Sequence, residues 1–95
     1  MSKQVRDESM DHLMDGFLTL KNRDERYHFL EDLCTISELE AMSQRFEVAG
    51  MLRKEKTYQD IAKATGASTA TISRVNRALT YGDDGYDTVL NRLEK

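Results

Sequence analysis

Helix-capping residues recur along this chain and divide it into short segments, which limits the possible folds more than any other feature. Asn22 and Ser37 are each followed, three residues later, by a glutamate, the spacing of a capping box. Thr57 and Ser68 each stand before a stretch in which apolar residues repeat at helical spacing. The chain has no proline, and leucine, alanine and methionine dominate its apolar residues. The sequence therefore predicts an all-α fold.

Six helices are predicted between these signals. We expect them over residues 7–21, 22–34, 37 to the basic run 53–56, 57–66, 68–80 and 86–93. The cations of the basic run suit the negative end of the helix dipole. With 95 residues the chain has room for one domain, residues 1–95, and residues 1–9 are predicted to form a flexible arm. A chain of this size buries only about two thirds of its unfolded surface. Association with a second copy is therefore expected.

Several classes of function are disfavoured by composition. No stretch approaches the roughly 18 apolar residues of a membrane span, and the N-terminus lacks the apolar core of a signal peptide. Cys34 is the single cysteine, so a metal site would have only His12 and His28 to add. The five glycines are scattered singly, which argues against a phosphate-binding loop. We predict no catalytic residues, no metal site, no enzymatic activity and a cytoplasmic location.

Charge is distributed unevenly in this acidic chain of net charge −3. Residues 1–43 carry five Lys or Arg against ten Asp or Glu, whereas residues 44–79 carry seven against three. Phosphate contacts are local, so one basic segment is compatible with nucleic-acid binding in an acidic protein. A solvated helix face would explain the charge cluster equally well.

Residues 57–80 have the layout of a helix-turn-helix. Two short helical stretches are separated by a turn that contains Gly66 and Ala67, and Ala62 is small enough for close approach of the two helices. An ordinary helical hairpin is the alternative interpretation. The apolar residues expected to lock the two helices together are Ile61, Ile72, Val75 and Leu79.

The helix predicted over residues 68–80 has an outward face suited to DNA. Residues 67–79 contain no carboxylate, and the side opposite the apolar residues carries short hydroxyls and arginines. A helix that enters the major groove needs these residue types and must avoid acids. The residues predicted to contact double-stranded DNA are Lys56, Thr57, Gln59, Lys63, Ser68, Thr69, Ala70, Thr71, Ser73, Arg74 and Arg77.

Residues 35–79 resemble the Trp repressor superfamily. The segment TISELEAM, residues 35–42, is similar to the opening of that family's third helix. The segments QDI, residues 59–61, and GASTATISR, residues 66–74, are similar to its helix-turn-helix. Chain length and Val75 suggest the YerC/YecD branch rather than Trp repressor itself.

The resemblance implies a bacterial, nucleoid-associated transcriptional regulator with a six-helix chain. It implies an intertwined homodimer that presents helix 68–80 of each chain to successive major grooves. Such a dimer binds a palindromic operator with half-sites about one helical turn apart, and represses by occupying a promoter.

The resemblance also implies where an amino-acid corepressor would bind. Arg45 and Arg74 match the two arginines that sandwich the family's ligand, and Thr35 matches a residue near its amino group. A family glycine beside the indole corresponds to Val75, and a serine corresponds to Ala78. The Val75 side chain would fill the space of the ring, so we expect no tryptophan and no cofactor.

Three hypotheses about function follow from the sequence. The favoured one is a dimeric DNA-binding regulator that acts without an effector. The second is a protein-interaction module that uses the acidic surface of the first two helices. The third is a small-molecule sensor with a pocket around Thr35, Arg45 and Arg74.

Overall fold

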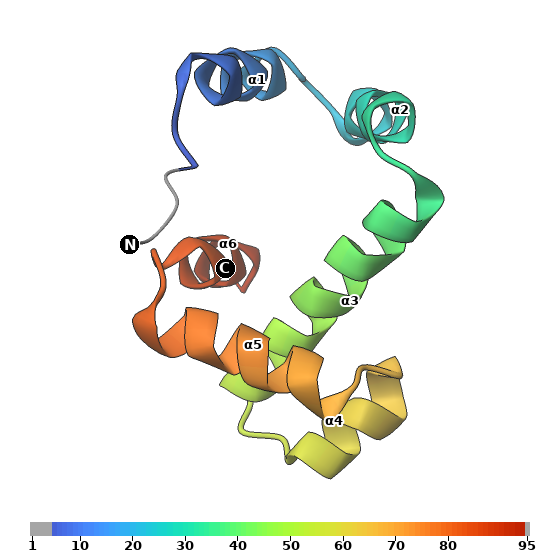
Figure 1. Cartoon of the computed structure of the whole chain (residues 1–95), viewed down its shortest axis with the longest axis vertical. Coiled ribbons are helices and arrows are strands. Elements are labelled where there is room, and N and C mark those ends of the chain that lie inside the picture. The colour runs from blue at the N-terminus through green and yellow to red at the C-terminus, as the bar shows by residue number, and fades with distance from the viewer. Residues whose placement is uncertain (1–4, 95) are drawn as a thin grey trace. The chain divides into compact units, whose positions relative to one another are not determined.

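The computed structural model describes residues 5–94, which form six helices and no strand (Figure 1). The all-α, six-helix prediction is therefore confirmed. The chain divides into two compact units, residues 1–36 and residues 37–95. The helices are α1 (Glu8–Leu18), α2 (Arg23–Leu33), α3 (Ile36–Arg53), α4 (Tyr58–Thr65), α5 (Thr69–Tyr81) and α6 (Gly85–Leu93).

Side-chain caps begin both helices of the first unit. The backbone N–H of Met10 donates to Asp7 Oδ1 at 2.8 Å, and that of Glu25 donates to Asn22 Oδ1 at 2.9 Å. Glu25 also reaches back, because its Oε1 accepts from the Lys21 N–H at 2.8 Å. The predicted cap at Asn22 is confirmed, and caps of this kind stabilise a helix by about 1 kcal/mol each.

The predicted first helix and N-terminal arm have different bounds in the structure. α1 ends at Leu18 rather than at residue 21, and the Thr19 hydroxyl donates to the Gly16 carbonyl at 2.7 Å. Of the predicted arm over residues 1–9, residues 1–4 lie outside the described part of the chain. Glu8 and Ser9 already belong to α1, because the Asp7 carboxylate caps the helix at that point.

Neither α1 nor α2 contains a buried residue. The rings of Phe17 and Phe29 meet edge to face with centroids 5.2 Å apart. Leu18 remains 82% exposed, Tyr27 60% and Leu33 49%. The helices of this unit therefore carry apolar side chains that the unit does not cover.

The start of α3 differs from the prediction. The helix begins at Ile36, so Ser37 lies within its first turn and is not the cap. Thr35 directly precedes the helix and has Glu38 three residues after it, which is again capping-box spacing. Thr35 and Ser37 therefore give two overlapping capping-box signals, and the local sequence alone does not choose between them.

The core of the second unit lies where α3, α4, α5 and α6 meet (Figure 1). The predicted wedge is confirmed, since Ile61 and Ile72 are fully buried, Val75 is 1% exposed, and Leu79 packs against them. Val48, which was not among the residues predicted to be buried, is also fully buried. The complete buried set is Val48, Ala49, Ile61, Ala67, Ile72, Val75 and Leu90.

Arg53 fastens α6 to the C-terminal end of α3. Its Nη2 donates to Asn91 Oδ1 at 2.7 Å, and its Nε lies 3.6 Å from Asp87 Oδ1. Glu94 Oε2 lies 4.0 Å from the same Nη2. Arg53 therefore joins two helices far apart in the sequence.

A left-handed glutamate ends α3. The Lys56 N–H donates to the Met51 carbonyl at 3.1 Å and the Glu55 N–H donates to that of Leu52 at 2.9 Å. This pattern is the Schellman motif, which requires a residue of positive φ and favours glycine there. Glu55 occupies that position with φ of 60°.

Replacing Glu55 by glycine is therefore expected to stabilise the protein. Left-handed backbone costs a non-glycine residue about 1 kcal/mol, which corresponds to a rise in Tm of roughly 4–8 °C for a chain of this size. Thermal unfolding of Glu55→Gly measures this change. Lys54→Gly is the matched control, because Lys54 has no positive φ and should lose stability. A Glu55→Gly variant no more stable than the parent would contradict the expectation.

Candidate nucleic-acid interface

The turn between α4 and α5 has the local geometry that the sequence predicts. Thr57 caps α4, since its side chain accepts from the Asp60 N–H at 3.1 Å. Gly66 ends α4 with a φ of 75°. A Cβ at this position would meet no other atom, so the backbone conformation, rather than crowding, favours glycine here. Ser68 then caps α5 by accepting from the Thr71 N–H at 3.1 Å. The two helices pack against each other, as in a helix-turn-helix.

Hydrogen bonds of Thr65 hold the turn. Its hydroxyl donates to the Ile61 carbonyl at 2.7 Å and accepts from the N–H of the buried Ala67 at 3.1 Å. Its carbonyl accepts from Gln44 Nε2 of α3 at 3.1 Å. The contact of Gln44 could not be predicted from the sequence, because 21 residues separate the two partners and no local pattern links them.

The residues predicted to contact DNA are almost all exposed. They extend from the segment before α4, through α4, to the outer face of α5, and Thr71 alone among them is half-buried. We define the outer face of α5 as its exposed side opposite the core, composed of Thr69, Ala70, Ser73, Arg74 and Arg77.

Two of the predicted hydroxyls have different capacities for further hydrogen bonds. The Ser68 hydroxyl donates to Thr71 Oγ1 at 3.1 Å, so its one proton is already used within the helix cap. The Thr57 hydroxyl accepts from the Asp60 N–H and keeps its proton for an outside acceptor. A phosphate oxygen only accepts hydrogen bonds, so Thr57 suits phosphate better than Ser68 does.

The charges on this surface are unpaired. Lys56, Lys63, Arg74 and Arg77 are exposed and form no ion pair with any residue in the range 5–94. α5 is also the helix without an acidic residue in its first turn, whereas each of the other five described helices has at least one. The surface of α5 therefore offers positive charge and a helix N-terminus without a competing carboxylate.

The residues predicted to surround an effector lie in both units. Thr35 belongs to the first unit, and the second contains Arg45, half-buried on α3, and Arg74, exposed on α5. Val75 is in the core, where its side chain packs whether or not a ligand is present. Ala78 is exposed.

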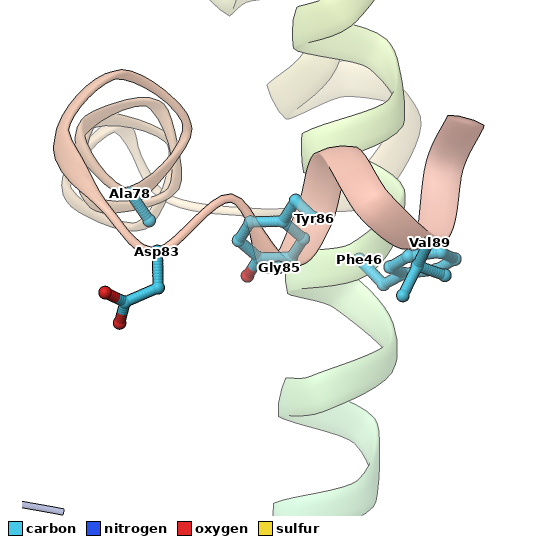
Figure 2. Close-up of a pocket in the computed structure, with 6 residues that line it drawn as sticks. All are labelled: Phe46, Ala78, Asp83, Gly85, Tyr86 and Val89. Carbon is cyan, nitrogen blue, oxygen red and sulfur yellow. The ribbon is translucent and has the colours of Figure 1, made fainter. Parts of the chain in front are cut away.

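A hollow of about 430 Å³ lies beside Ala78. Figure 2 shows that its walls come from α3, α5, α6 and the segment between α5 and α6. Its lining is almost entirely apolar, and Asp83 is its one charged member; Thr35, Arg45 and Arg74 do not line it. The lining residues are Phe46, Ala78, Asp83, Gly85, Tyr86 and Val89.

The part of the chain that the structure describes lacks two other kinds of feature. Within residues 5–94, no cluster of three or more His, Cys, Asp or Glu side chains is arranged to hold a metal ion. No helix in the same range is long and apolar enough to cross a membrane.

The fold and this surface define the chain as a helix-turn-helix protein with an exposed basic face. Residues 8–94 match the model of the Trp repressor protein family. The chain belongs to that family, which consists of DNA-binding regulators rather than enzymes.

Relatives support this assignment over nearly the full length. The chain is 49% identical over 92 residues to the protein YerC of Bacillus subtilis (strain 168), covering 97% of this chain and 88% of YerC. It is similar to the crystal structure of a TrpR-like protein from Eubacterium eligens ATCC 27750, with a TM-score of 0.91, 58% identity, and coverage of 95% and 93%. A candidate Trp repressor from Staphylococcus aureus has a TM-score of 0.92, 47% identity, and coverage of 98% and 96%. The YerC-type resemblance is confirmed.

Proposed function

We propose that this protein is a sequence-specific transcriptional regulator that binds double-stranded DNA through α5. The observation that carries the proposal is the outer face of α5, which is exposed, free of acids and furnished with two unpaired arginines. Occupancy of a promoter would make the protein a repressor. Such a role places it in the bacterial cytoplasm, associated with the nucleoid.

Different residues on this surface suit different parts of DNA. Arg74 and Arg77 can form paired hydrogen bonds with guanine or bind phosphate, and Ala70 can pack on a thymine methyl group. Thr69 supplies a short hydroxyl near the helix N-terminus. Before and within α4, Lys56, Thr57, Gln59 and Lys63 would bind phosphates, which fix the position of the protein on the duplex.

The proposed active form is a homodimer. The first unit exposes Leu18, Tyr27 and Leu33, and exposed apolar patches mark interaction surfaces. Ile36 and Met42 are also exposed, at 76% and 42%. A second copy of the chain would cover these side chains and present two α5 helices related by a two-fold axis.

Selection from a random duplex DNA library, without added ligand and at moderate salt, tests the proposal. We expect enrichment of a palindrome whose half-sites are about 10 base pairs apart, because a dimer presents its two helices to successive major grooves. Sedimentation of the enriched complex should give two chains per duplex. A library that enriches no sequence, or a complex with one chain per duplex, would contradict the dimeric regulator.

A small-molecule sensor is the second candidate, and the hollow beside Ala78 favours it. Its volume of about 430 Å³ is within the range of ligand pockets, roughly 300–1,000 Å³. The same selection repeated with mixed amino acids and indoles separates the two functions, since a sensor enriches its palindrome only with ligand. A complex with a different protein in the absence of DNA would instead support an interaction module.

A further inference from the structure

The turn between α4 and α5 is fastened to α3 by one amide side chain. Thr65 is the last residue of α4, so its carbonyl has no partner within that helix. Gln44 Nε2 donates to this carbonyl at 3.1 Å, in a partly buried setting. The hydrogen bond joins the end of the first helix of the helix-turn-helix to the middle of α3.

A chain of hydrogen bonds continues from this contact towards α5. Through its hydroxyl, Thr65 accepts from the N–H of Ala67, which is 4% exposed. Ser68 follows directly and caps α5. The position of the Thr65 backbone relative to α3 therefore constrains where the N-terminus of α5 begins.

We propose that Gln44 is a positioning residue for DNA recognition. By holding the Thr65 carbonyl, it keeps the turn, and with it the outer face of α5, at one place on α3. This inference rests on the proposed function. It predicts a specific effect, since contacts with base edges depend on accurate placement, whereas attraction to phosphates depends mainly on charge.

The variant Gln44→Met tests the inference, because methionine keeps the length and neutrality of glutamine and removes the donor. A net hydrogen bond corresponds to about fivefold in an equilibrium. We therefore expect the Ala67 amide to exchange with solvent about fivefold faster. The amide of Val75, in the middle of α5, should keep its exchange rate, whereas general destabilisation would accelerate both. Ser43→Ala, an exposed neighbour on α3, is the control and should change neither.

Binding supplies the second measurement. The probes are the palindrome enriched from the random library and a random-sequence duplex of equal length. We expect Gln44→Met to weaken binding to the palindrome about fivefold for each half-site, and so about 25-fold for a dimer, and to change binding to the random duplex less than about twofold. Equal losses on both probes, or no loss on either, would overturn the positioning role.

The two measurements separate this inference from the proposed function. If the library enriches no sequence, the proposed function fails, and amide exchange still decides whether Gln44 holds the turn. Unchanged exchange at Ala67 would overturn the inference even if the wild-type protein binds a palindrome.

Discussion

Replacing Arg77 by alanine is expected to weaken binding to the enriched palindrome by roughly tenfold for each half-site, and so by about 100-fold for a dimer. Arg77 projects from the outer face of α5 and is exposed, with no carboxylate partner among the described residues. Loss of its guanidinium removes two to four hydrogen bonds and two positive charges from a dimer. Titration by fluorescence anisotropy at several salt concentrations measures both effects.

The salt dependence distinguishes base contact from phosphate contact. If Arg77 binds phosphate, Arg77→Ala lowers the slope of log affinity against log salt by about 2 for a dimer. If Arg77 binds guanine, Arg77→Lys keeps the charge but loses the paired hydrogen bonds and the discrimination between bases.

A charge-matched control uses an arginine outside the helix-turn-helix. Arg92 is exposed on α6, and Arg92→Ala should leave affinity within about twofold, because phosphate contacts are local. Arg74→Ala tests the second arginine of the face. Wild-type affinity in both Arg77→Ala and Arg74→Ala would exclude the outer face of α5 as the DNA-binding surface.

Replacing Ile72 by alanine is expected to lower the free energy of unfolding by about 2–5 kcal/mol. Ile72 is fully buried, with 0% of its surface exposed, and lies in the core with Ile61, Val48 and Val75. Removal of three carbons leaves a cavity in a core of few residues. Because small domains have a free energy of unfolding of only about 5–15 kcal/mol, this one substitution would remove a large part of the stability.

Urea unfolding at fixed protein concentration measures this loss, since the stability of a dimer depends on concentration. Ile72→Val is the graded control and should cost about 0.5–1.5 kcal/mol. Ile36→Ala is a second comparison, because Ile36 is 76% exposed in the single chain. A substitution that removes only exposed surface should cost at most about 0.5 kcal/mol, and a larger loss would place Ile36 at an interface between chains. A cost for Ile72→Ala no greater than that for Ile72→Val would contradict the buried position.

The helix-turn-helix could be predicted from sequence because its signals are local. Thr57 and Ser68 bond to residues three positions away, and Gly66 is required by the backbone conformation at one position. The buried sides of α4 and α5 follow from the spacing of Ile61, Ile72 and Val75 on regular helices. The absence of carboxylates from residues 67–79 also belongs to the sequence alone.

Other features depend on contacts between residues far apart in the chain, and these only the tertiary structure decided. Gln44 bonds to Thr65 and Arg53 to Asn91, across 21 and 38 positions, respectively. Nothing in the sequence around Gln44 or Arg53 distinguishes either residue from a polar residue that faces solvent. The hollow beside Ala78 likewise requires three helices and a loop at once. Helix starts and apolar faces arise from neighbours within one or two turns, whereas the support of the turn and the anchoring of α6 arise only when separate helices pack together.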